Sequence, residues 1–134
     1  MRAALKLPAA LAACLALSAC VEEAQPSGAE DFASYCASCH GVGGKGDGEL
    51  ASALEKRPAD LTTLTQRNKG EFPRLRMMAK IWGYTGTHDG GAVMPNFGPL
   101  LESRMVPYDA GDGIQSPTPE RLVQLAEYVE GLQL

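Results

Sequence analysis

The chain has 134 residues, of which 45% are hydrophobic and 21% are charged, and its formal net charge is −4 at pH 7. These values are typical of one soluble globular domain accompanied by some additional sequence. The acidic balance excludes a general binder of nucleic acids or of anionic membranes, because both need a clearly basic surface.

The first 19 residues have the order of a secretory signal peptide. Arg2 and Lys6 are followed by an apolar run from Leu7 to Leu17 and then by small residues. The run is too short to span a bilayer. We therefore predict that residues 1–19 are a lipoprotein-type signal peptide and that the rest of the chain is exported.

Two processing sites are compatible with the end of this segment. The sequence LSAC, Leu17 to Cys20, resembles the lipobox of bacterial lipoproteins, in which the peptide is cut before the cysteine and its thiol is acylated. Cys20 would then anchor the protein to the periplasmic side of a membrane through acyl chains. The alternative is cleavage after Ala24, which would release a soluble periplasmic protein. Residues 20–29 are polar and broken by Pro, Ser and Gly, so we predict a flexible tether.

The predicted domain, residues 30–134, begins with a helix that carries two cysteines. Phe32, Tyr35, Cys36 and Cys39 have helical spacing within Ala29–His40. Glycine-rich sequence follows and ends this helix. Further helices are predicted for Glu49–Lys56, for Pro73–Trp82 with Leu75 and Met78 among its apolar positions, and after Thr118.

The last helix has the clearest signals. Thr118 is the predicted N-cap and Pro119 the first helical residue, and an apolar stripe follows at Leu122, Leu125, Ala126 and Val129. No long run of strand periodicity is found, so the predicted class is all-α with long loops. Four short helices make a thin core for about a hundred residues, which suggests that another apolar body fills the centre.

The sequence YCASCHG, which starts at Tyr35, indicates what that body is. On a helix, Cys36 and Cys39 face nearly the same side and His40 follows directly. This C-x-x-C-H spacing is the attachment signature of c-type haem: two thioethers and one iron ligand. A zinc site would need a fourth ligand, for which only His88 remains. A thioredoxin-like redox pair would need a preceding strand and a βαβ surround.

Residues 30–134 resemble the class I c-type cytochromes, which are small electron carriers with a single haem. The matching segments are YCASCHG, RPADLT at Arg57–Thr62, MPNFG at Met94–Gly98 and the terminal helix PERLVQLAEYVEGL. The resemblance implies a cytochrome c-like fold, with short helices and long loops wrapped around one covalently attached haem. It also implies His40 as an axial ligand of the iron.

Met94 is the predicted sixth ligand. It precedes Pro95, which favours an extended and stiff loop, and the methionine ligand of these cytochromes usually lies in a Met-Pro sequence. Met77 and Met78 fall on a predicted helix and are better explained as core. Met105 is a weaker alternative, and His88 would give a second imidazole ligand and a lower potential.

The resemblance also implies supporting roles. The carbonyl of Pro58 would accept a hydrogen bond from His40 and so orient its ring. Trp82 would donate its N–H to a haem propionate, although a core position is equally compatible. Phe32 and Tyr35 on the first helix would meet Leu125 and Tyr128 on the last. The segment 99–117 is long for the family and has no predicted role.

The predicted function is one-electron transfer between redox proteins, without enzymatic activity and without a small-molecule substrate. Two alternatives stay open: a haem sensor with an open sixth position, and the electron-entry subunit of a larger oxidoreductase. A peroxidase is disfavoured because no distal base is found close to Met94. A basic docking surface is predicted from Lys45, Lys56, Arg57, Arg74, Arg76 and Lys80.

Overall fold

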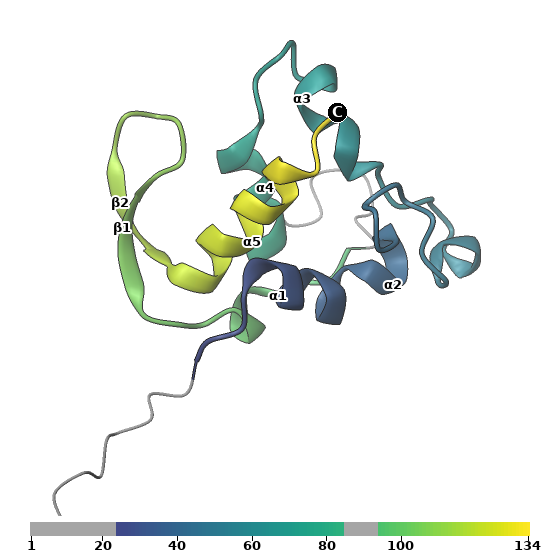
Figure 1. The fold of residues 1–134 in the computed structure, drawn as a ribbon, viewed down its shortest axis with the longest axis horizontal. Helices are drawn as coiled ribbons and strands as arrows, with labels where there is room; N and C mark the ends of the chain where they lie inside the picture. The colour runs from purple at the N-terminus through teal and green to yellow at the C-terminus, as the bar shows by residue number, and fades with distance from the viewer. Residues whose placement is uncertain (1–23, 85–93) are drawn as a thin grey trace, which may run out of the picture.

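The computed structural model describes residues 24–84 and 94–134. The described part is mainly helical and contains one two-stranded antiparallel sheet (Figure 1). The elements in chain order, with η for short 3₁₀ helices, are α1 (Gly28–Tyr35), α2 (Ala37–His40), η1 (Ala51–Ala53), η2 (Leu61–Thr63), α3 (Leu64–Arg67), α4 (Arg74–Trp82), η4 (Gly98–Leu100), β1 (Met105–Asp109), β2 (Gln115–Pro119) and α5 (Glu120–Gly131). The predicted signal peptide and Cys20 lie outside the described residues.

Helix α1 begins with a capping box. The backbone N–H of Glu30 donates to Ser27 Oγ at 3.3 Å, and the carboxylate of Glu30 accepts the N–H of Ser27 at 2.8 Å. These reciprocal bonds satisfy two donors that a helix start otherwise leaves unpaired. The helix therefore begins at Gly28, two residues before the predicted start of the domain at Glu30.

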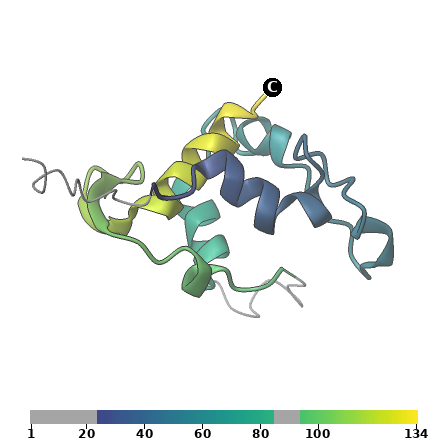
Figure 2. The ribbon, with the colours of Figure 1, turned by 60° about the horizontal axis from the view of Figure 1, so that its bottom comes forward.

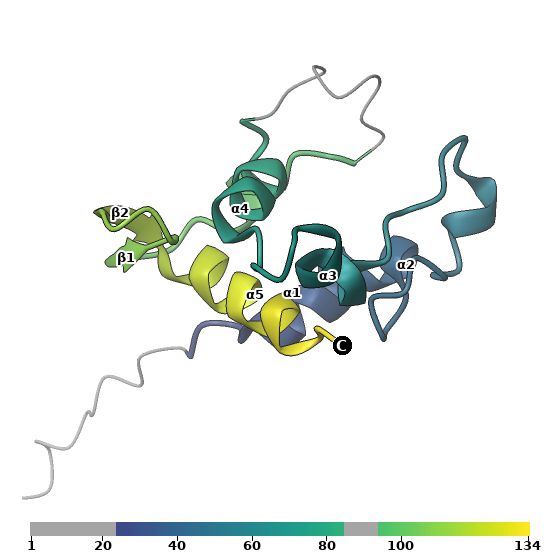
Figure 3. The same cartoon turned by 90° about the horizontal axis from the view of Figure 1, so that it is seen from above.

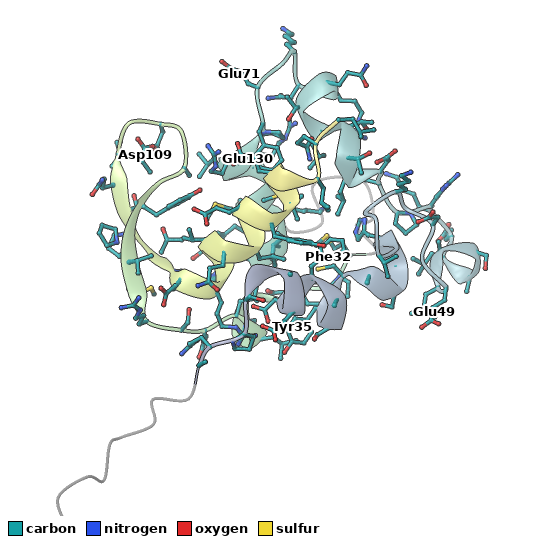
Figure 4. All side chains as sticks on the ribbon, viewed as in Figure 1. Phe32, Tyr35, Glu49, Glu71, Asp109 and Glu130 are labelled. Carbon is teal, nitrogen blue, oxygen red and sulfur yellow. The ribbon has the colours of Figure 1, made fainter. Side chains whose placement is uncertain are left out.

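The core is built where α1 crosses α5 (Figures 1 and 2). Gly28 lies so close to α5 that a Cβ atom there would overlap the carbonyl of Gln124. The ring of Phe32 packs against that of Tyr128, with centroids 5.2 Å apart, and Figure 4 shows Phe32 pointing toward α5. This confirms the predicted crossing for Phe32. The ring of Tyr35 lies beside that of Phe97, with centroids 6.2 Å apart.

A buried ion pair also joins the two helices. Asp31 is buried, and the guanidinium of Arg121 donates to both of its carboxylate oxygens, with one N···O distance of 3.0 Å. A third N–H of Arg121 donates to the carbonyl of Leu100 at 2.8 Å. Because these bonds satisfy most of the polar atoms of the pair, they offset the cost of removing both charges from water.

Helix α4 packs on α5 and matches the prediction within one residue. Met78 and Ile81 are buried in the core, and Arg74 forms an ion pair with Glu130 of α5. The hydrogen bond to Glu130 raises the pKa of the Arg74 guanidinium. Leu75 was predicted on the same side as Met78, and both line one cavity beside the hairpin, although Leu75 is 54% exposed.

The two-stranded sheet corrects the all-α prediction. Strands β1 and β2 pair antiparallel, with Met105 opposite Pro119 and Pro107 opposite Pro117. Only Val106 and Tyr108 of β1 turn partly inward, so the alternation is too short to recognise in the sequence, and prolines interrupt both strands. Asp109 closes the hairpin by accepting the N–H groups of Gly111 and Gly113 at 2.8 and 3.0 Å. The segment 99–117 thus contributes most of a hairpin.

The hairpin also shifts the start of α5. Thr118 was predicted as its N-cap, but Thr118 belongs to β2 and pairs with Val106, so the cap position falls on Pro119. The predicted stripe of α5 is confirmed, since Leu122, Leu125, Ala126 and Val129 are all buried.

The expected helix over Glu49–Lys56 is reduced to the single turn η1. The reason is local: the N–H groups of Gly48 and Leu50 donate back to the carbonyls of Cys39 and Ser38 of α2, at 3.1 and 2.9 Å. They are therefore held in a loop that packs on α2 rather than in a new helix. Figure 3 shows α2 with this loop at one end of the molecule and the hairpin at the other.

Candidate functional site

The C-x-x-C-H motif lies at the junction of two helices rather than on one continuous helix. Cys36 ends α1 and precedes α2, and the N–H of His40 donates to the carbonyl of Cys36 at 2.8 Å. Cys36 is 8% exposed and Cys39 is half-buried, and both thiols are free. Burial, with the nearby Asp31 and Cys39, raises the pKa of the Cys36 thiol to about 12.

The glycines after His40 let the loop fold back over the C-terminal end of α2. The N–H of Gly46 donates to the carbonyl of His40 at 2.8 Å, and a Cβ atom on Gly48 would overlap the carbonyl of Ser38. Gly46 has a φ of 73°, a conformation that side-chain-bearing residues rarely adopt. The loop thus supplies partners for carbonyls that the end of a helix leaves unpaired.

The imidazole of His40 is oriented by a backbone carbonyl. Its Nδ1 donates to the carbonyl oxygen of Ala59 at 2.9 Å. Since a carbonyl only accepts, Nδ1 carries the hydrogen and Nε2 carries the lone pair that can bind a metal ion. The predicted acceptor, the carbonyl of Pro58, was wrong by one residue, because that carbonyl instead lies against Gly46. Pro58 remains part of the cavity wall described next.

One cavity brings the predicted ligands together. It has a volume of about 360 Å³, and Cys36, Cys39, His40 and Met94 all line it. Most of the remaining wall is apolar and includes Tyr35, Leu54, Pro58 and Phe97. Two thiols, one imidazole and one thioether therefore face the same mainly apolar space, although Met94 is 54 residues from His40 in the sequence.

This donor set fits a c-type haem. Two thiols at C-x-x-C spacing can form thioethers, and His40 and Met94 are a familiar pair of axial ligands for haem iron. An apolar wall suits a flat macrocycle, and a cavity of several hundred Å³ is in the usual size range for ligand sites.

The other candidate ligands lie elsewhere. Met78 is 5% exposed and belongs to the core, and Met77 packs against that core. Met105 is 62% exposed on β1 and lines a second cavity of about 210 Å³, between α4 and the hairpin. Trp82 lines this second cavity too, not the one with Met94. His88 lies outside the described residues.

Three of the six predicted docking residues lie at the cavity with Met94. Lys56, Arg57 and Lys80 line it, and Arg57 Nε also donates to the carbonyl of Gly46 at 3.2 Å. Arg74 is paired with Glu130, and Arg76 reaches Asn68. The basic residues at the cavity are therefore fewer than the sequence suggested.

Two contributors to the site were missed. Ala59 holds His40, and Phe97 lines the cavity and donates its N–H to the carbonyl of Ile81 at 3.0 Å. Both lie within quoted motifs, RPADLT and MPNFG, so the signal was in the sequence. The loop conformations that select these two residues depend on contacts with distant parts of the chain.

Comparison with known families gives one match. The family model described as cytochrome C oxidase, cbb3-type, subunit III, matches residues 23–106, which is more than half of the chain. The matched range contains Cys36, Cys39, His40 and Met94, and it ends within β1. No match was found among curated proteins or among solved structures. Within the described residues, no helix is long and apolar enough to cross a membrane.

Proposed function

Because the chain belongs to the c-type cytochrome family of the cbb3-type oxidase subunit III, we propose that it transfers single electrons between redox proteins through one covalently bound c-type haem. The observation that carries this proposal is the shared cavity of Cys36, Cys39, His40 and Met94. The presence of one C-x-x-C-H motif in the sequence supports a single haem.

Each ligand residue has a distinct part in the proposal. Cys36 and Cys39 would hold the macrocycle through thioether bonds, while His40 and Met94 would bind the iron. When bound, the haem supplies a one-electron couple of iron, and a thioether ligand raises its potential. The chain itself excludes water with the apolar wall and fixes the His40 ring through Ala59. Because His40 and Met94 would both come from the protein, the residues around the cavity would need to move little on reduction.

The basic residues at the cavity support a docking role. Lys56, Arg57 and Lys80 would surround the route by which electrons enter or leave, so an acidic face on the partner would be attracted to that opening. We propose this reduced set of three residues as the docking surface, without Arg74, which pairs with Glu130.

The family description supports a second, narrower possibility for the partner. The matched family is described as a subunit of an oxidase. The chain would then deliver electrons within a larger oxidoreductase instead of diffusing between separate proteins. The same haem site serves both arrangements. The sensor alternative is disfavoured, because Met94 lines the cavity at which a sixth ligand would bind.

We also propose that the protein is exported and anchored through Cys20. The support is the LSAC sequence directly after the apolar run. The chain between Cys20 and the start of α1 at Gly28 can reach roughly 25 Å when extended. Such a tether would let the domain turn toward partners close to the membrane surface. Cleavage after Ala24 is the alternative, with a soluble periplasmic protein as its result.

Replacement of Met94 tests the haem proposal. In the oxidised protein, we expect Met94→Ala to lose the weak near-red absorption band of an iron–thioether bond and to lower the reduction potential. Met105→Ala removes an equal side chain from the exposed face of β1, and it should keep both properties. Absorption spectra and redox titration measure the outcome. A near-red band that persists in Met94→Ala would show that another residue is the ligand.

A further inference from the structure

The side chain of Asn96 lies between its own segment, which follows Met94, and the C-terminal end of α4. Asn96 Oδ1 accepts the N–H of Gly98 at 2.8 Å. On its other side, the amide group lies against Gly83, where a Cβ atom would be 2.5 Å from Asn96 Cγ. A Cβ atom on Gly98 would also be crowded, at 3.1 Å from Asn96 Oδ1. Although Asn96 is exposed, its amide group is thus wedged between two glycines.

Gly83 is suited to this contact for two reasons. It ends α4 in the left-handed conformation, with a φ of 96°, and its N–H donates to the carbonyls of Ala79 and Lys80. Glycine adopts this conformation at little cost, and the missing Cβ leaves the space that Asn96 occupies. Gly83 therefore both ends α4 and provides the space in which the Asn96 side chain lies.

A backbone hydrogen bond also joins this segment to α4. The N–H of Phe97 donates to the carbonyl of Ile81 at 3.0 Å. Ile81 is buried in the core, and α4 is joined to α5 by the ion pair of Arg74 with Glu130. Residues 96–98 are therefore fastened to a helix that is itself held in the core.

We propose that Asn96 is a positioning residue that keeps Met94 at the haem cavity by fixing the Met94–Gly98 segment to Gly83. Asn96 lies two residues from Met94 and does not line the cavity, so it acts through the backbone and not on the iron. This proposal rests on the proposed function, since it assigns to Asn96 the stability of the bond between Met94 and the iron.

Displacement of Met94 by imidazole measures this stability. Imidazole binds the oxidised iron only when Met94 leaves, so its apparent affinity reports how firmly Met94 is held. We expect Asn96→Ala to raise that affinity about three- to tenfold, the size of effect that one lost hydrogen bond produces. Asn96→Asp retains the acceptor oxygen and should stay close to the wild type. Asn68→Ala makes the same substitution in another turn, where the Asn68 amide donates to the carbonyl of Glu71. It should leave the imidazole affinity unchanged.

A double-mutant cycle isolates the contact with Gly83. Gly83→Ala introduces both backbone strain and a clash with Asn96, whereas in an Asn96→Ala background only the strain remains. We therefore expect Gly83→Ala to raise imidazole affinity less in the double variant than in the wild type. Equal effects in both backgrounds would mean that the two residues act independently, and they would overturn the proposal.

A readout that does not depend on the iron completes the test. Amide hydrogen exchange at Gly98 should be faster in Asn96→Ala than in the wild type, because its N–H loses its acceptor. If the wild type shows the near-red band but Asn96→Ala matches it in imidazole affinity and exchange, the role of Asn96 is refuted and the haem proposal stands. If the wild type itself lacks the band, both proposals fail.

Discussion

Replacement of both Cys36 and Cys39 by alanine is expected to abolish covalent attachment of haem completely. These two thiols are the ones that line the cavity of His40 and Met94, and no other cysteine is found in residues 24–84 and 94–134. Any haem in the double variant should therefore be extracted by acidified acetone and be lost on a denaturing gel stained for haem. The wild-type protein, made in an exporting host with c-type haem maturation, should retain the stain.

Cys20→Ala is the matched control, because it makes the same substitution outside the cavity. This variant should keep the covalent haem but lose the acyl anchor, so it should move from the membrane fraction to the soluble fraction. Haem staining and fractionation read the two sites separately. Covalent haem in the Cys36/Cys39 double variant would refute the attachment site. Retention of Cys20→Ala on the membrane would refute the lipid anchor and leave the haem site intact.

Asp31→Ala should be the most destabilising of the single substitutions considered. Asp31 is buried, and the side chain of Arg121 is only 12% exposed. Removal of the carboxylate leaves a nearly buried guanidinium without its charged partner, which costs about 3 to 5 kcal/mol in comparable pairs. We expect the free energy of unfolding of the haem-loaded protein to fall by about that amount in urea titrations. The loss would weaken the contact between α1 and α5. Cys36 lies at the C-terminal end of α1, so its position depends on this contact.

The ion pair between Arg104 and Glu120 provides the comparison. It is bidentate, with one distance of 2.6 Å, but the side chain of Arg104 is 71% exposed. Glu120→Ala should therefore cost less than about 1 kcal/mol. Replacement of both buried partners, as Asp31→Leu with Arg121→Met, should recover much of the loss because no charge stays unpaired. A cost for Asp31→Ala as small as that for Glu120→Ala would contradict the assigned role of the buried pair.

Short-range patterns in the sequence identified Cys36, Cys39 and His40, which line one cavity in the structure. The C-x-x-C-H motif places three groups within five residues, so they stay close together even though the chain passes from α1 to α2 at Cys36. The apolar stripe of α5 is equally local, and its four predicted positions are buried. Met94 was identified from the proline that follows it and from the family resemblance, and it lines the cavity with His40.

Details that depend on distant contacts were not predictable in the same way. The acceptor for His40 is Ala59 and not Pro58, because the loop at Gly46 occupies the position against the Pro58 carbonyl. Trp82 lines the second cavity because the hairpin supplies its other wall. The hairpin itself was missed, since prolines interrupt the alternation that would reveal its strands.

The sequence by itself determined the family, the thiols and imidazole that would hold a haem, and the helical character of most of the described chain. Each of these depends on residue types that recur at a fixed, short spacing. Residues so close in the chain are also close in space, whatever the rest of the chain does. Only the tertiary structure decided which carbonyl orients His40, which of the two cavities Trp82 lines, and that Asn96 lies against Gly83. These choices depend on packing between segments far apart in the chain, where a shift of one residue changes the partner.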